Sequence, residues 1–164
     1  MATLLNSTQV IEQDQWQPLA EGQQAGEFSI VSLTHWQENQ AELTSLAASG
    51  KLGLQLESGE TADLVGEHAG QFALICIDFP KFIDGRGYSA ARLFRERYGY
   101  QGELRAVGDV LIDQLFFMKR VGFNSFALRA DQDVEDAITA FQTFTNPYQG
   151  DVHDSRPLFR RHAG

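Results

Sequence analysis

The sequence is poor in metal-binding and redox-active side chains. Cys76 is the only cysteine among the 164 residues, which excludes an internal disulfide and any multi-cysteine zinc or iron–sulfur site. The histidines, His35, His68, His153 and His162, have no spacing to one another or to Cys76 that suggests a ligand set. We therefore expect no metal site, and a reducing cytoplasmic compartment fits the cysteine content best.

Long apolar runs and an overall basic charge are also missing. No run approaches the roughly 20 residues that cross a bilayer, and the N-terminal MATLLNSTQV lacks the pattern of a signal peptide. The formal net charge is −9, whereas nucleic-acid backbones bind basic surfaces. These absences argue against a nucleic-acid partner and against a membrane role.

Nucleotide-binding motifs are absent as well. The first strong strand pattern, at 28–33, is followed by THWQ without the glycines that a dinucleotide fingerprint requires, and no P-loop spacing occurs. The sequence therefore predicts no cofactor.

The chain does contain a regular alternation of strand and helix patterns. Each of five apolar, strand-like segments is followed by a helix-like one, with helices expected at 34–50, 61–70, 89–99, 109–122 and 133–144. The strands are expected at 28–33, 52–58, 72–79, 103–108 and 124–129.

Such alternation predicts an α/β fold of five strand–helix units with a mostly parallel sheet. The chain is too short for a closed eight-unit barrel, so either an open doubly wound sheet or a partial TIM-like barrel fits. We divide the chain into an N-terminal extension (1–26), a single α/β domain (27–146) and a C-terminal tail (147–164). Segment 72–79 is apolar on both faces, as expected of a central strand or a barrel wall.

Charge is unevenly distributed along the chain. Residues 1–80 hold eleven acidic residues and one lysine, whereas residues 81–105 hold six basic residues and three acidic ones. A positive segment in a negative protein can concentrate a small anion. Alternatively, its arginines cover a solvated helix and pair with acids from elsewhere.

Ligands of parallel α/β folds bind beyond the carboxyl ends of the strands, where the DGRGYS loop (84–89) is expected. Two glycines let its main chain approach a ligand, and a serine N-cap would open the next helix toward the loop. We predict an anion site formed by Asp84, Gly85, Arg86, Gly87, Ser89 and Arg129, with Asp78 and Asp109 orienting the arginines.

Simpler interpretations of these residues stay open. The loop could be an ordinary turn in which Arg86 pairs with Asp84 or Asp78, and Arg129 could pair with Asp131 or Asp133. Asp109 is typical of a helix N-cap, and with Asp113 it makes only a weak case for a cation site. Cys76 is typical of a buried, inert thiol.

The helix pattern at 109–122 has a wide apolar face. Leu111, Leu115 and Met118 share one side of it, with Ile112 and Phe116 adjacent. Core packing explains this pattern, and the excess width leaves room for a homodimer interface.

The segment FPKFIDGRGYSAARLFRERYGYQGELRAVGDVLIDQLFFMKRVGFNSFALR resembles a bacterial domain family of unknown function, over roughly residues 72–145. Members of that family are described as oxidoreductases involved in sulfite reduction, because they are encoded beside the haem-containing sulfite reductase subunit. The resemblance implies a role near assimilatory sulfur metabolism, and it implies no catalytic residue.

Three functions follow as hypotheses. The first is an accessory protein of sulfite reduction that binds a small oxyanion or a phosphate-bearing ligand. The second is an interaction module that docks on the haem-containing subunit through its acidic surface. The third is an enzyme of unknown substrate, such as the oxidoreductase named for the family, with Asp78 or Asp109 as general base.

Overall fold

The computed structural model describes residues 2–80 and 85–143, which form an α/β fold around one seven-stranded sheet. The five strands predicted from the sequence are all present. They are preceded by two short strands, and the bounds are β1 Thr3–Leu5, β2 Gln17–Pro18, β3 Ser29–Ser32, β4 Leu52–Leu56, β5 Leu74–Phe79, β6 Glu103–Gly108 and β7 Ser125–Leu128.

The helices differ more from the sequence prediction. The single helix expected at 34–50 is two helices, because Asn39 ends the first by donating its amide and its side-chain Nδ2 to the carbonyl of His35. The segment expected as a helix at 61–70 forms two 3-10 helices. The helices are α1 Leu33–Glu38, α2 Gln40–Ala48, η1 Ala62–Leu64, η2 Gly66–Gln71, α3 Arg86–Glu96, η3 Ile112–Gln114, α4 Leu115–Val121 and α5 Val134–Thr143.

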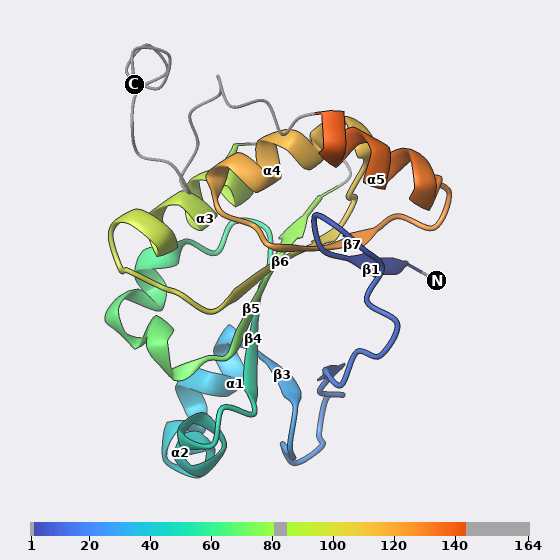
Figure 1. The fold of residues 1–164 in the computed structure, drawn as a ribbon. Helices are drawn as coiled ribbons and strands as arrows, with labels where there is room; N and C mark the ends of the chain where they lie inside the picture. Colours follow the sequence, from blue (N-terminus) through green and yellow to red (C-terminus); the bar gives the residue numbers. More distant parts are fainter. Residues whose placement is uncertain (1, 81–84, 144–164) are drawn as a thin grey trace.

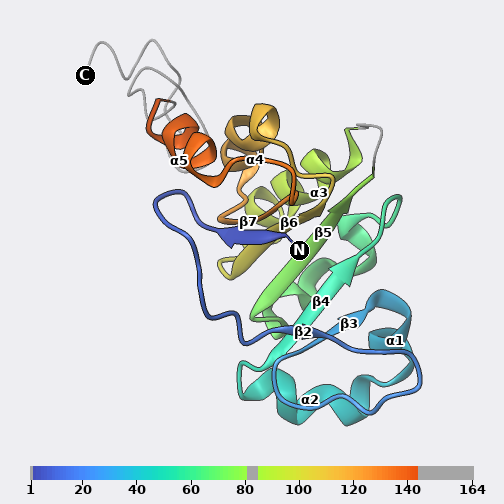
Figure 2. The same ribbon diagram turned by 90° about the vertical axis from the view of Figure 1, so that its right-hand side faces the viewer.

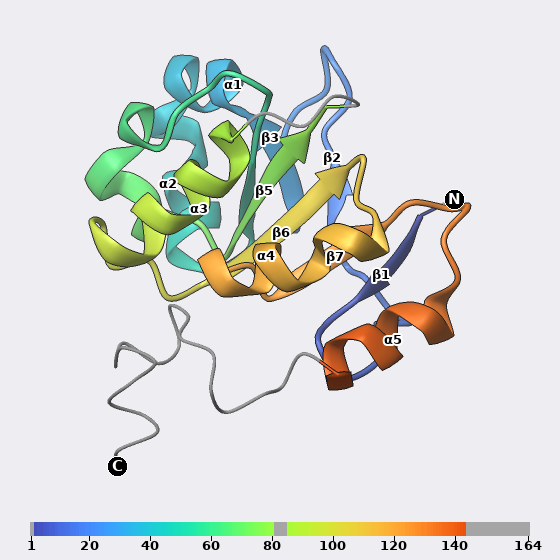
Figure 3. The same ribbon diagram turned by 90° about the horizontal axis from the view of Figure 1, so that it is seen from above.

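Strands β2 to β7 lie side by side in chain order and pair in parallel. Because parallel crossovers are right-handed, this order places the connecting helices on one face of the sheet. Figures 1 and 3 show the helices gathered there and the sheet curled as a half-barrel. The arrangement matches the partial-barrel alternative and not the doubly wound one, whose helices cover both faces.

The N-terminal residues belong to the sheet rather than standing apart from it. Strand β1 pairs antiparallel with β7 at one edge, so the sheet is mixed, and β2 pairs with β3 at the other edge. Residues 6–16, which join these two strands, therefore cross the helix-free face from edge to edge (Figure 2). We call residues 6–18 the N-terminal strap.

The two faces of the sheet bury different amounts of apolar surface. Ile75, Ile77 and Phe79 of β5 point into the large core under the helices, whereas Leu74 and Cys76 belong to a small cluster on the helix-free face. All five side chains are buried. The predicted two-sided burial of this strand is confirmed, and the structure makes it part of a barrel wall.

Most of the apolar face predicted at 109–122 is core. Leu115 and Met118 are fully buried, whereas Phe117 on α4 is 56% exposed. Within residues 2–80 and 85–143, none of the helices has the length and apolarity that a membrane span needs.

Candidate functional site

The carboxyl ends of β5, β6 and β7 meet at one edge of the sheet, as predicted. The Asp109 amide donates to the carbonyl of Phe79 at 3.0 Å, and the Arg129 amide donates to the carbonyl of Val110 at 3.0 Å. The main chain therefore brings the ends of these three strands to a common rim. The side chains at the rim then diverge to three places.

The first place is the start of α3. The helix begins at Arg86 with Gly85 as its N-cap, and the Ser89 amide already donates to the Gly85 carbonyl at 3.0 Å. The prediction of Ser89 as N-cap is therefore wrong, because the loop turns helical three residues earlier. Gly87 lies within the helix, where a Cβ would come within 2.6 Å of the Phe79 ring, so its bare Cα permits close packing. Asp84 lies outside the described residues.

A cavity of about 300 Å³ opens at this helix start. Gly85, Arg86 and Ser89, three of the predicted anion-site residues, line it, together with Thr61, Ala62, Ala90 and Leu93. Its described lining contains one positive charge and no carboxylate. The first amides of a helix have no partner within the helix, and at the start of α3 these include the amides of Gly87 and Tyr88. We call this cavity the α3 pocket.

The second place is an ion-pair cluster around Arg129. Its Nη1 donates to Oδ1 of Asp109 at 2.6 Å, and its Nε and Nη2 donate to the two carboxylate oxygens of Asp131 at 2.6 and 2.7 Å. Both predicted partnerships are thus formed, with Asp109 and with Asp131. Asp109 is not an N-cap, because the next helix, η3, is capped by Leu111. These bonds raise the pKa of Arg129 and lower that of Asp131.

The Arg129 cluster is separate from the α3 pocket, whose described lining lacks Arg129, Asp109 and Asp131. The two predicted arginines therefore share an edge of the sheet but not a described cavity. All three guanidinium nitrogens of Arg129 donate to carboxylates, two to Asp131 and one to Asp109, so an anion bound there would lie beside two negative charges. Direct contact of Arg129 with an anion stays a prediction.

The third place is the helix-free face, where Asp78 lies at the rim of another cavity. Burial raises the pKa of the Asp78 carboxyl, and the nearby charge of Glu57 raises it further. This environment suits a general base, and that role for Asp78 stays a prediction. Asp78 does not line the α3 pocket.

Sequence reasoning gave no role to Arg105, which is 5% exposed in the middle of β6. Its Nη1 and Nη2 donate to the two carboxylate oxygens of Asp14 at 2.9 and 3.2 Å, and its Nε and Nη2 donate to Glu103 Oε2 at 3.2 and 2.9 Å. The signal in the sequence was a charged residue between Leu104 and Ala106, in a strand otherwise fit for burial. Its partner on the strap, Asp14, has no signal of its own.

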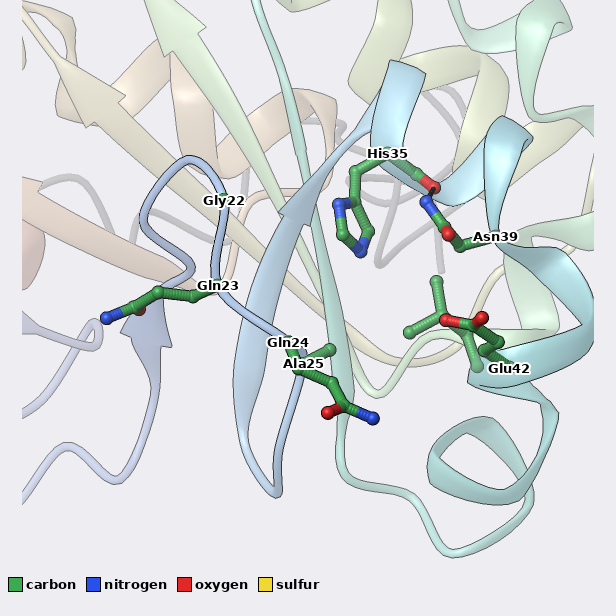
Figure 4. A pocket seen from close by; sticks show the side chains of 8 residues that line it. Gly22, Gln23, Gln24, Ala25, His35, Asn39 and Glu42 are labelled. Atoms are coloured by element: carbon green, nitrogen blue, oxygen red, sulfur yellow. Dashed lines mark hydrogen bonds between the residues drawn. The ribbon is translucent and has the colours of Figure 1, made fainter.

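Figure 4 shows a further cavity, of about 250 Å³, between the loop at 22–25 and helices α1 and α2. His35, Asn39 and Glu42 line it, and Asn39 donates to the carbonyl of His35 at 2.9 Å. None of the predicted site residues contributes to it. Among the described residues, no group of three or more histidine, cysteine, aspartate or glutamate side chains is placed to hold a metal ion.

Burial raises the pKa of the Cys76 thiol to about 12, so the group is neutral at physiological pH. This agrees with its prediction as an inert core residue, although its surroundings are more polar than predicted, because the charge of Arg105 lowers this pKa while those of Glu103 and Asp14 raise it.

Comparison with known proteins places the chain in a family. Residues 53–159 match the family model described as "Bacterial protein of unknown function (DUF934)". The matched range contains all but the first residue of β4, strands β5 to β7 and helix α3, and with them Gly85, Arg86, Ser89, Arg105 and Arg129. No curated protein matches the sequence. The match covers most of the chain, and the protein therefore belongs to the DUF934 family of bacterial proteins.

Proposed function

We propose that this protein is a cytoplasmic accessory protein of assimilatory sulfite reduction, which holds a small oxyanion or a phosphate-bearing ligand in the α3 pocket. One observation carries the proposal: Arg86, Ser89 and the N-cap Gly85 line a cavity of about 300 Å³ whose described lining holds no carboxylate. In a chain of net charge −9, the described lining of this cavity places no negative charge beside a bound anion.

The chemistry of the pocket suits an oxyanion. Helix α3 has eleven residues, and its N-terminal amides and dipole favour negative charge. Arg86 already interacts with another group, and its positive charge still favours an anion nearby. The hydroxyls of Thr61 and Ser89 can add donors. Ala62 and Leu93 supply an apolar wall that limits the competing water.

The link to sulfite reduction comes from the family resemblance of the segment that contains this pocket. Proteins like it are encoded beside the haem-containing subunit of sulfite reductase, whose substrate is a small oxyanion. A pocket for an oxyanion is therefore the feature expected of a protein that assists that enzyme, by holding its substrate or by sensing it.

Isothermal titration calorimetry with sulfite, sulfate and phosphate tests the proposal. We expect binding of at least one of them with a dissociation constant in the millimolar range or tighter, weakened about tenfold or more by Arg86→Ala. Arg92→Ala is the matched control, because Arg92 lies on the exposed side of the same helix and pairs with Glu96. Binding by none of the three anions, or equal effects of the two variants, would contradict the proposal.

A second candidate function is docking on the haem-containing subunit. The observation in its favour is the excess of acidic residues in residues 1–80, several of them exposed on α1, α2 and the 3-10 helices, such as Glu38, Glu42 and Glu67. Co-purification with the subunit that weakens as salt is added would support it. Failure to form a complex at low ionic strength would remove it.

A further inference from the structure

A row of three polar side chains and one cysteine crosses the helix-free face of the sheet. Gln55 of β4 pairs in register with Cys76 of β5, Cys76 with Arg105 of β6, and Arg105 with Ser125 of β7. Because side chains alternate between the faces of a strand, these four residues point to the same side. The other face at the same level is fully apolar, so a polar row here calls for a physical reason.

Arg105 is held by a closed set of acceptors. Asp14 and Glu103 take hydrogen bonds from all three of its nitrogens, and the Ser125 hydroxyl donates to Glu103 Oε2 at 2.7 Å. Two carboxylates face one guanidinium, so this group carries a formal net charge of −1. An anion approaching the guanidinium would meet two carboxylates, and the Arg105 side chain is only 7% exposed.

The N-terminal strap roofs part of the face. The Trp16 ring packs over Gly53, where an added Cβ would come within 3.2 Å of it, and it contacts the small apolar cluster that contains Ile30. Strap residue Asp14 is fixed to Arg105. The strap is thereby anchored at both sheet edges and in the middle, and it leaves the part of the face nearest the carboxyl ends of the strands uncovered.

A cavity of about 400 Å³ occupies that uncovered part. Apolar side chains from Trp16 of the strap, Leu4 of β1 and Val107 of β6 contribute to its lining. Gln55 and Cys76 contribute to its floor, and Asp78 stands at its rim, beside Gly108. We call this cavity the strap pocket.

The charge of the strap pocket is negative. Asp14, Asp78 and Arg105 line it, and Glu103 is bound to the same arginine, while Glu57 is close enough to act on the Asp78 carboxyl. Within residues 2–80 and 85–143, no donor forms a hydrogen bond to the Asp78 carboxylate. An acceptor that is partly desolvated and lacks a donor favours a ligand that brings one.

From this arrangement we infer that the strap pocket is a binding site for a small organic cation, an ammonium group attached to an apolar body. The ammonium binds the Asp78 carboxylate at the rim. The apolar body lies between Trp16 and Val107, which both line the cavity. This site is independent of the α3 pocket, which lies on the other side of the sheet and favours the opposite charge.

Nuclear magnetic resonance of the full-length protein tests the inference, because the chain has only two tryptophans. Trp16 lines the strap pocket, and Trp36 is buried under the helices on the other face, so its indole N–H signal is an internal control. The probes are benzylamine, its neutral analogue benzyl alcohol and the anion benzoate. Asp78→Asn removes the proposed partner, and Asp113→Asn removes the same charge from the exposed surface of η3.

We expect benzylamine to shift the Trp16 indole signal in a saturable manner, with a dissociation constant in the low millimolar range or tighter, and to leave Trp36 unmoved. Benzoate should bind about tenfold more weakly or worse, as should benzylamine to Asp78→Asn, whereas Asp113→Asn should bind as the wild type does. No shift of Trp16, or equal binding of benzylamine and benzoate to the wild type, would overturn the inference without requiring any variant. Unchanged binding of benzylamine to Asp78→Asn would overturn it too.

Discussion

The two faces of the sheet are covered by different interactions, which alternate residues of the same strands make. The face under the helices is closed by apolar packing, and Leu104 and Ala106 of β6 are fully buried there. On the opposite face the buried apolar cluster has three members among the described residues, Ile30, Leu74 and Cys76. This face is closed instead by a short strap held through an ion pair. A half-barrel lacks the strands that would complete the wall and whose side chains would fill the interior. Here the strap and the polar row cover part of the exposed inner face and leave a cavity beside them.

The sharpest test of this comparison measures the loss of stability caused by substituting two neighbouring residues of β6. Leu104→Ala should cost about 3 kcal/mol of unfolding free energy by leaving a cavity in the apolar core. Arg105→Ala should cost about 2 to 3 kcal/mol for another reason, because it leaves Asp14 and Glu103 facing each other without their cation. Chemical denaturation measures both.

The two losses of unfolding free energy should respond differently when the carboxylates around Arg105 are also removed. In an Asp14→Asn, Glu103→Gln background the Arg105→Ala cost should fall by half or more, since no unpaired carboxylates remain, whereas the Leu104→Ala cost should stay the same. Equal costs of Arg105→Ala in both backgrounds would show that this arginine stabilises the fold through packing alone.

Gly108 is the last residue of β6, at the rim where the strand ends meet. It has a φ of +89°, and a Cβ added there would lie 2.5 Å from both Asp78 Oδ1 and the Phe79 carbonyl oxygen. Gly108→Ala should therefore destabilise the protein by about 2 kcal/mol. Gly70→Ala is a suitable control, because no atom lies within 4 Å of its added Cβ. Similar melting temperatures for the two variants would argue against the strained geometry at the rim.

The strap should contribute less to the free energy of unfolding than the helical side does. Asp14→Asn keeps the shape of the side chain but removes its charge, and because Asp14 is 32% exposed the loss should be about 1 kcal/mol. The strap should also open more often, so the Cys76 thiol, which lies in the floor of the strap pocket and belongs to the cluster that Trp16 packs against, should react faster with a thiol reagent. Glu12→Gln on the same segment should react at the wild-type rate. A labelling rate that Asp14→Asn leaves unchanged would mean that the strap does not cover Cys76.

The smallest effect concerns Asp78 and pH. Its folded-state pKa is raised by burial first and by Glu57 second, so between the unfolded value of about 3.9 and the folded value the native state binds more proton than the unfolded chain. The contribution of Asp78 to stability therefore increases as pH falls through this window. The wild type should gain stability relative to Asp78→Asn between pH 7 and pH 4, as chemical denaturation at both values would show. If the difference in stability between the wild type and Asp78→Asn is constant with pH, the pKa of Asp78 is the same in the folded and unfolded states.

The sequence predicted the strands well because apolar alternation is a local signal. It indicated the burial of 72–79 on both faces, and it placed Asp78, Asp109 and Arg129 at one rim from strand direction alone. It failed at Ser89, because the helix already begins at Arg86, where Gly87 lies against the Phe79 ring, a contact that the capping preference of a serine does not reveal.

The rest depended on contacts far apart in the chain. Asp14 and Arg105 are separated by 91 residues, and the edge pairings of β1 and β2 involve segments too short to show a strand pattern. The face on which each rim side chain lies likewise depends on the residue at which its strand ends, because side chains alternate between the two faces. A one-residue shift in that alternation would have put Asp78 beside Arg86, as the sequence allowed.

One titration tests most directly the claim that this rim has two pockets of opposite charge preference on opposite faces of the sheet. A single isotope-labelled sample of the wild type would receive sulfite first and benzylamine second, with amide and indole signals followed throughout. We predict that sulfite moves the amides of residues 85–89 and leaves the Trp16 indole in place, and that benzylamine does the reverse. Movement of the same set of signals by both ligands, or exchange of the two patterns, would contradict the account.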